Sequence, residues 1–225
     1  MHWLTPETAV NIALSRLHFP VSTLGPGRRV GIWFQGCSIR CPGCVSADTW
    51  AQGRGITTVD SLVEALWPWL READGITISG GEPFDQPQAL HALLQVIPRA
   101  PSQDILVFSG HPFETLVSDP LVSTGCIDAL ISDPFLDGTS QTLPLRGSDN
   151  QRLHLLTELG KQRFARYQAP LETDQRSLDV MFDDDGSVWL AGIPKQGDMH
   201  RLRALLGHQG HEIYTTAAPS RETPT

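Results

Sequence analysis

The feature that most constrains the fold of this 225-residue chain is an alternation of short apolar runs with helical patterns. Runs rich in strand-forming residues lie at 28–36, 75–79, 104–110 and 127–133. Apolar positions at helical spacing lie at 57–72 and 86–97, with a shorter helical segment at 112–118. Strands that alternate with helices are typical of a parallel sheet or barrel. The sequence therefore predicts the α/β class.

The loops that carry suggestive chemistry all follow the predicted strands. A cysteine-rich loop follows the first, "GGEP" at 80–83 the second, "SGHP" at 109–112 the third and "DPF" at 133–135 the fourth. The carboxyl ends of parallel strands share one face of a barrel, or one crevice of an open sheet. We therefore expect the cysteines and Glu82 to face one cavity.

The cysteine-rich loop, "GCSIRCPGC" at 36–44, holds Cys37, Cys41 and Cys44, while Cys126 stands alone. Three readings are open. Three thiolates suit an iron–sulfur cluster that keeps one iron free for another ligand. A zinc site would need a fourth ligand from a histidine or Cys126, and a third possibility is plain buried cysteines. We expect Cys126 to be inert.

Charge and hydropathy limit the partners of the protein. A formal net charge of -8 argues against nucleic acid as the main partner. The first residues, "MHWLTPETAV", do not resemble a signal peptide, and no stretch reaches the length of an apolar membrane span. With reduced cysteines, this pattern predicts a cytoplasmic protein without a membrane partner.

Two glycines in "GGEP" allow close approach of the backbone to a ligand and expose main-chain carbonyl and N–H groups, and Glu82 offers an acceptor for an amine. Alone, this motif could equally be a tight turn at a helix N-terminus. Together, the C-x3-C-x2-C loop and "GGEP" resemble the radical S-adenosylmethionine superfamily. The stretches at 25–50, 78–84 and 145–156 are similar to the activating proteins of glycyl radical enzymes, above all to anaerobic ribonucleotide reductase activators.

The resemblance, which covers roughly residues 23–156, implies an incomplete parallel (β/α) barrel. Its [4Fe-4S] cluster would be held by Cys37, Cys41 and Cys44, and the fourth iron would chelate S-adenosyl-L-methionine. Gly80, Gly81 and Glu82 would receive the methionine amino group. The reduced cluster would cleave this cofactor to a 5′-deoxyadenosyl radical that takes hydrogen from a glycine of a partner protein.

The resemblance also implies an electron donor such as flavodoxin or ferredoxin. Two other functions stay open: a radical enzyme acting on another peptide or a small molecule, and a non-enzymatic zinc or iron–sulfur binding module. The short loops at the strand ends leave little material for a lid, which favours a macromolecular substrate over an enclosed metabolite.

Three further residues are candidate cofactor contacts. Asp133 ends the fourth predicted strand, where it could instead serve as a cap or turn residue. Arg146 and Asn150, in "LRGSDNQ", could bind a carboxylate or a ribose, since Arg presents forked donors to carboxylates. Their alternative role is a surface loop. Val45 and Ser46 depart from the pattern of the activators, which leaves the adenine contacts open.

The predicted organisation is a core at 1–160, an extension of the same domain at 161–216 and a polar tail at 217–225. Within the extension, 176–194 is typical of two strands around an Asp-Gly turn, and 197–210 of a helix closed by glycine. The extension could cover the open side of the barrel, bind a partner, or simply complete the fold.

Overall fold

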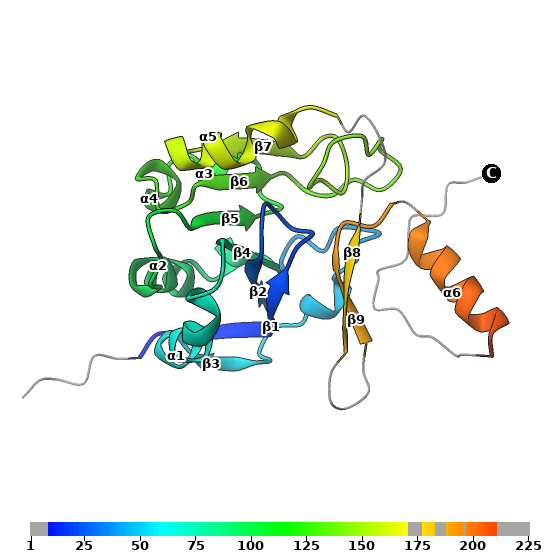
Figure 1. Ribbon diagram of the computed structural model, residues 1–225, viewed down its shortest axis with the longest axis horizontal. Coiled ribbons are helices and arrows are strands. Elements are labelled where there is room, and N and C mark those ends of the chain that lie inside the picture. Colours follow the sequence, from blue (N-terminus) through cyan, green and yellow to red (C-terminus); the bar gives the residue numbers. More distant parts are fainter. Residues whose placement is uncertain (1–8, 171–176, 183–187, 196, 211–225) are drawn as a thin grey trace, which may run out of the picture.

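The computed structural model describes residues 9–170, 177–182, 188–195 and 197–210, and Figure 1 shows their arrangement. The strands are β1 Asn11–Val21, β2 Arg29–Phe34, β3 Ile56–Thr58, β4 Gly75–Gly80, β5 Asp104–Phe108, β6 Ala129–Ser132, β7 Arg152–Leu155, β8 Leu178–Phe182 and β9 Val188–Gly192. The α-helices are α1 Val59–Leu70, α2 Pro87–Val96, α3 Phe113–Leu116, α4 Pro120–Ser123, α5 Glu158–Phe164 and α6 Asp198–His208. Short 3-10 helices are η1 Ala47–Thr49, η2 Pro83–Asp85 and η3 Ala165–Gln168.

Seven strands form one open mixed sheet in the order β3-β1-β2-β4-β5-β6-β7. The four strands β2, β4, β5 and β6 run parallel, whereas β1 pairs antiparallel with β2 and β3, and β7 pairs antiparallel with β6. The α/β prediction is therefore confirmed. The expected incomplete parallel barrel is not confirmed: within the described residues the sheet is open and mixed, because three strands that the pattern did not predict join its parallel strands in the antiparallel direction.

These three strands have weak local signals for identifiable reasons. Along β1, register shifts between Leu14 and Arg16 and between His18 and Val21 interrupt the alternation of buried and exposed residues. Strands β3 and β7 have only three and four residues, too few for a clear period of two. Their assignment depends on their partners in the sheet.

The two faces of the sheet are covered by different elements. On one face, α1 and α2 contribute Leu62, Leu66, Leu90 and Leu93 to the largest apolar cluster, against side chains of β2, β4 and β5. On the other face, Phe164 of α5 packs against β5 and β6. The β8–β9 hairpin packs on this second face too, over β1 and β2. Both layers leave the carboxyl ends of the parallel strands to the loops.

A buried ion pair fixes the opposite ends of these strands. The Arg29 guanidinium, fully buried, donates to Asp104 Oδ1 at 2.6 Å and to Thr77 Oγ1. Arg163 of α5 donates to the second oxygen of Asp104 at 2.8 Å. Burial alone lowers the pKa of Arg29, and the Asp104 carboxylate opposes that effect. This network holds β2, β4, β5 and α5 in register.

The extension contains the predicted hairpin and helix, β8, β9 and α6. The predicted Asp-Gly turn at 183–187 and the tail at 217–225 lie outside the described residues. No helix in the described part of the chain has the length and hydropathy needed to cross a membrane.

Candidate metal centre

The cysteine loop starts directly beyond β2 and is held by the main chain on two sides. The N–H groups of Gly36 and Cys37 donate to the carbonyls of Thr49 and Trp50, at 2.7 and 3.3 Å. On the other side, the Gly36 carbonyl accepts from Glu82 N at 2.8 Å. The loops after β2 and β4 therefore lie side by side, as their positions after parallel strands predict.

A second tie links the same two loops. Ser38 donates through its N–H and its hydroxyl to the two carboxylate oxygens of Asp85, at 2.6 and 2.8 Å. His111, which follows β5, places its Nε2 atom 3.5 Å from Asp85 Oδ1. Asp85 thus connects the loops after β2, β4 and β5.

The three thiols of this loop share an environment of partial burial and N–H donors. Burial raises the pKa of each thiol, and main-chain N–H groups of Ile39 and Arg40 partly offset this at Cys37. The thiols of Cys41 and Cys44 are half-buried and influence one another electrostatically. Since a bound metal deprotonates thiols outright, it would reverse the effect of burial.

Other donors reach the second and third thiols from outside the loop. Burial raises the pKa of Cys41, and the main-chain N–H of Phe135 partly offsets this rise. The Ser46 N–H lies 3.4 Å from Cys44 Sγ and opposes the rise that burial causes in the pKa of this thiol. Hydrogen bonds to the sulfurs are one of the means by which a protein sets the potential of an iron–sulfur cluster.

Arg40 adopts a left-handed conformation, with φ of 49°, between the first two cysteines. Gly43 has φ of 75°, and a Cβ there would lie 3.1 Å from the Phe135 ring. Consecutive turns of this kind direct N–H groups toward one point and form an anion-binding concavity. The backbone of this loop therefore suits negatively charged thiolates.

Within the described residues, no three His, Cys, Asp or Glu side chains gather closely enough to hold a single metal ion. A zinc ion binds all its thiolates at about 2.3 Å, which needs such a tight group. In a cluster each thiolate binds a different iron, so the sulfurs can stand further apart. Three thiols on one loop, with N–H donors directed at their sulfurs, are a donor set that fits a [4Fe-4S] cluster with an open iron.

Glu82 lies within the wall of the site, with only 1% of its surface exposed. Its Oε1 accepts from Phe84 N and Ser109 Oγ at 3.0 and 2.9 Å, and its Oε2 accepts from Gly110 N at 2.8 Å. Burial raises the pKa of this carboxyl and these donors oppose the effect. Glu82 thus ties the ends of β4 and β5 together. Direct contact of Glu82 with an amine stays a prediction.

Gly80 and Gly81 make the close approach of this turn possible. Gly80 has φ of 101°, and a Cβ at Gly81 would lie 2.1 Å from the Gly36 carbonyl oxygen. A side chain at either position would push the turn away from the cysteine loop. The two glycines are therefore required for the close contact between the two loops, independent of any ligand that binds there.

Arg146 and Asn150 carry the two buried side-chain atoms that lack a hydrogen-bond partner among the described residues, Nε and Oδ1 respectively. Arg146 is 4% exposed, and its Nη1 donates to the carbonyls of Pro144 and Tyr167. Asn150 Nδ2 donates to the Pro134 carbonyl at 2.8 Å. The pKa of Arg146 is lowered by burial. A buried guanidinium N–H and a buried amide oxygen without partners each cost folding free energy. Both therefore fit contact with a polar ligand that carries an anionic group.

Phe135 places this pair beside the cysteine loop. A Cβ at Gly43 would lie 3.1 Å from one edge of the Phe135 ring, and a Cβ at Gly147 would lie 2.9 Å from another. One aromatic ring thus separates the cysteine loop from the backbone next to Arg146. The orphaned atoms belong to the same rim of loops as the thiols.

Asp133 lies at this rim as predicted, with φ of 81° and its N–H bonded to the His111 carbonyl. Its carboxylate accepts from Arg152 at 2.7 and 3.0 Å and from Ser132 Oγ at 2.8 Å. Arg152 also binds both oxygens of Glu114. These bonds commit the Asp133 carboxylate to neighbouring side chains, and its contact with a cofactor stays a prediction.

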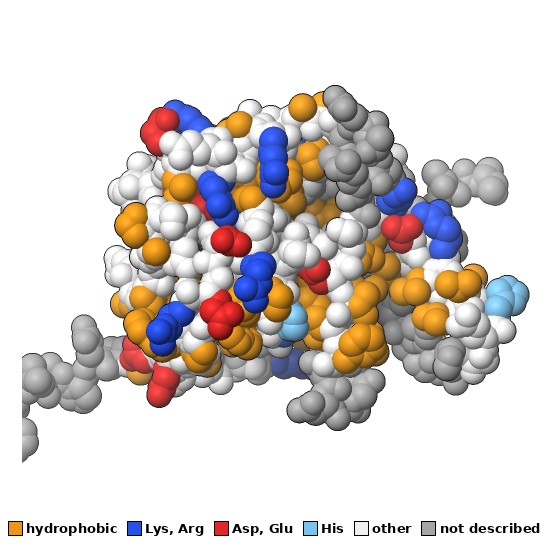
Figure 2. Space-filling view, viewed as in Figure 1, with side chains coloured by type: hydrophobic (Ala, Val, Ile, Leu, Met, Phe, Trp, Pro, Cys, Tyr) orange, Lys and Arg blue, Asp and Glu red, His pale blue; other side chains and the backbone are white. Residues whose placement is uncertain are grey.

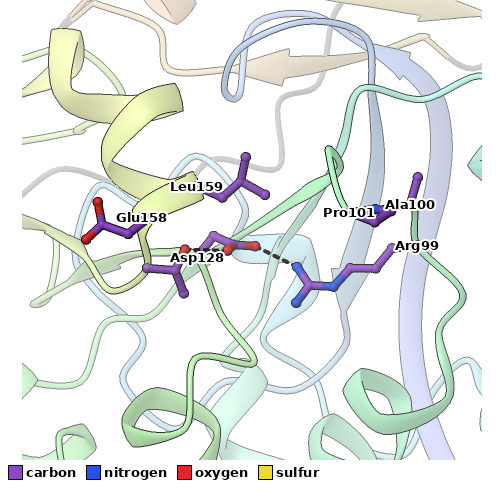
Figure 3. A pocket seen from close by; sticks show the side chains of 7 residues that line it. Arg99, Ala100, Pro101, Asp128, Glu158 and Leu159 are labelled. Atoms are coloured by element: carbon purple, nitrogen blue, oxygen red, sulfur yellow. Dashed lines mark hydrogen bonds and ion pairs between the residues drawn. The ribbon is translucent and has the colours of Figure 1, made fainter.

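An open depression of about 400 Å³ lies near the amino-terminal end of β6, away from the cysteines. Figure 3 shows Arg99 and Asp128 directed at one another across it, 2.6 Å apart. The second Asp128 oxygen accepts from Thr157 Oγ1. Because Arg99 and Asp128 neutralise each other, we assign this depression a structural role in which it links β6 to α5.

Comparison with known proteins decides the family. Residues 23–154 match the family described as a 4Fe-4S single cluster domain, which is more than half of the chain and includes all three clustered cysteines. The chain belongs to this 4Fe-4S single cluster family. The match favours a cluster over zinc at the cysteine loop.

Three relatives of the chain carry the same name. The chain is 31% identical to the anaerobic ribonucleoside-triphosphate reductase-activating protein of Escherichia coli (strain K12), over 62% of this chain and 96% of that protein. Proteins of the same name from Vibrio cholerae serotype O1 and Enterobacteria phage T4 are 28% and 29% identical, over 62% and 57% of this chain and 96% and 85% of theirs. The predicted resemblance to activating proteins is thereby confirmed.

Several residues of the candidate site escaped prediction from sequence. Ser109 and Gly110 lay in a noted loop, "SGHP", but nothing local indicated that they bind Glu82. The Trp50 carbonyl accepts from Cys37 N and the Phe135 ring lies beside Gly43, although both residues are separated from these positions along the chain. An aromatic side chain close to a cysteine loop was the one available signal.

Proposed function

We propose that this protein is a radical S-adenosylmethionine enzyme that activates a partner protein by removing hydrogen from a glycine. The supporting observation is the rim of loops beyond β2, β4, β5 and β6, where three thiols lie beside the glycine turn and near the buried Arg146 guanidinium, whose Nε–H has no hydrogen-bond partner among the described residues. The relatives' names describe activation of a reductase, which agrees with a protein as substrate.

In this proposal Cys37, Cys41 and Cys44 hold a [4Fe-4S] cluster, whose open iron takes the cofactor. Together, cluster and S-adenosyl-L-methionine supply a 5′-deoxyadenosyl radical, a reagent that no side chain can provide. The parallel strands β2, β4, β5 and β6 would correspond to the incomplete barrel of that superfamily. An electron donor such as flavodoxin or ferredoxin, and a cytoplasmic location, complete the proposal.

The chain's own residues would bind and orient the cofactor. Main-chain carbonyls of Gly80 and Gly81 accept from its amino group, while Glu82, with its carboxylate bound internally, fixes the turn and adds negative potential. Arg146 takes the carboxylate through its free Nε–H, and Asn150 Oδ1 accepts from a hydroxyl. Asp133, whose carboxylate forms an ion pair with Arg152, would contribute to the cofactor site through this pair.

The proposal is tested by anaerobic reconstitution with iron and sulfide, followed by reductant, S-adenosylmethionine and a candidate glycyl radical partner. We expect about four irons per chain and, by electron paramagnetic resonance, a protein-based glycyl doublet. Cofactor cleavage together with turnover of a small metabolite, and no radical on the partner, would contradict the activating role. Stoichiometric zinc without iron absorption would contradict the cluster itself.

A further inference from the structure

The β8–β9 hairpin lies beyond the family match, which ends at residue 154, and forms a two-stranded sheet of its own that packs on one face of the main sheet. Met181 and Ala191 of its inner face join Trp33 of β2 in one apolar cluster. Asp179 accepts four hydrogen bonds from the main chain and hydroxyls of Ser22 and Thr23, at 2.6 to 3.1 Å. The hairpin is therefore held firmly over the strand that leads into the cysteine loop.

Trp189 is the residue of β9 from which a chain of contacts leads to the cysteines. Its ring lies against Trp33 edge to face, with centroids 5.2 Å apart. The Arg16 guanidinium stands over the same indole, 4.8 Å from the ring centroid. This cation–π contact orients Arg16, because the guanidinium gains most when it lies over the ring face.

Arg16 connects Trp189 to the residues beside the cysteine loop. Its Nη2 binds Asp48 Oδ2 at 2.6 Å, and both side chains are half-buried. Asp48 is the middle residue of η1, whose neighbour Thr49 accepts from Gly36 N. An ion pair held on one side by an aromatic ring loses less side-chain entropy than a free surface pair.

The residues that flank η1, Ser46 and Trp50, meet two of the three cysteines. The Trp50 carbonyl accepts from Cys37 N at 3.3 Å. The Ser46 N–H lies 3.4 Å from Cys44 Sγ. A shift of η1 would therefore move one acceptor and one donor at the cysteines. The path from the hairpin to the thiols thus runs through Arg16 and η1.

We propose that Trp189 is a positioning residue for the iron–sulfur site, which it serves by fixing Arg16 and, through the Arg16–Asp48 ion pair of η1, the Ser46 N–H donor to Cys44. This inference rests on the cluster in the proposed function, not on the partner or the cofactor. It assigns the hairpin a role in setting the potential and retention of the cluster.

The opposite face of the same hairpin offers a matched control. Phe182 is 78% exposed and pairs across the strands with Val188, whereas Trp189 pairs with the buried Met181. Figure 2 shows apolar side chains gathered over the hairpin on the side that faces the viewer. Phe182→Ala therefore changes the hairpin without interrupting the path to the cysteines.

The experiment compares reconstituted wild type with Trp189→Leu, which keeps an apolar, though smaller, side chain and removes the aromatic ring. We expect iron release to a ferrous chelator to accelerate roughly twofold to thirtyfold, the range of one cation–π contact. The midpoint potential should become more negative, because the more negative reduced cluster loses an N–H donor. Trp189→Phe should restore most of both properties, and Phe182→Ala should match the wild type.

Arg16→Met breaks the path from its other side and leaves the hairpin core intact. It should reproduce the effect of Trp189→Leu, and the double variant should be no worse than either single one. Equal iron release and potential in Trp189→Leu and Phe182→Ala would overturn the inference while the cluster stands. A wild type that retains no iron would overturn the proposed function and this inference together.

Discussion

Gly81→Ala tests the contact between the glycine turn and the cysteine loop. A Cβ at this position would lie 2.1 Å from the Gly36 carbonyl oxygen, and real Cβ atoms keep at least about 3 Å. The two backbones must therefore separate by about 1 Å. That movement stretches the 2.8 Å bond from Glu82 N to the same oxygen and displaces the residue just before Cys37.

The cost is the sum of overpacking, about 1–3 kcal/mol, and a weakened hydrogen bond, about 0.5–1.5 kcal/mol. We expect Gly81→Ala to lose roughly 2–4 kcal/mol of unfolding free energy in urea and to bind less iron after reconstitution. Gly207→Ala is the control, since a Cβ there meets nothing within 4 Å and alanine favours a helix by about 0.5–1 kcal/mol. Wild-type stability and iron content in Gly81→Ala would refute the reasoning.

Three other predictions follow from single contacts. Cys44→Ala should abolish iron binding after reconstitution, whereas Cys126→Ala should retain it. Arg152 holds the pKa of Glu114 at about 2, so this pair stabilises the fold above about pH 4.5 and loses its effect as the pH falls to about 2; Arg152→Gln should flatten that part of a stability–pH curve. Arg146→Met should leave the cluster intact, while calorimetry records about tenfold or more weaker S-adenosylmethionine binding, since the Nε–H that we assign to the cofactor carboxylate is lost.

Local pattern was sufficient wherever an element carries its own signal. Helix α1 has apolar residues at helical spacing and the Thr58 cap, and it begins and ends within two residues of the predicted bounds. The short helix predicted at 112–118 is confirmed as α3, whereas α4, which Asp119 caps directly after it, was not predicted. Capping by Asp119 and the proline after it end one helical turn and start another, which periodicity alone does not resolve.

The residues of the candidate site also fall into two groups, those that local sequence predicts and those that tertiary packing brings together. The cysteines and the glycine turn are short local motifs, so their positions after strands could be predicted together. The hydrogen bonds to the Glu82 carboxylate could not be predicted, since Ser109 and Gly110 approach it only when β4 and β5 pair. The Arg146 Nε–H, which has no partner among the described residues, is likewise a property of tertiary packing, because a sequence names the charges but not their neighbours.

Residues beyond the end of the family match also support the candidate site. Beyond residue 154, the Tyr167 carbonyl accepts from Arg146 at 2.9 Å, and Arg163 completes the pairing of Asp104 beneath the sheet. Phe164 fills the apolar layer over β5 and β6, and Trp189 reaches the cysteine loop through Arg16. Each contact crosses from the later segment to a residue within the matched region. Removal of the later segment would thus expose the face opposite α1 and α2 and leave the Arg146 loop without one of its acceptors, so the site needs both segments to keep its geometry.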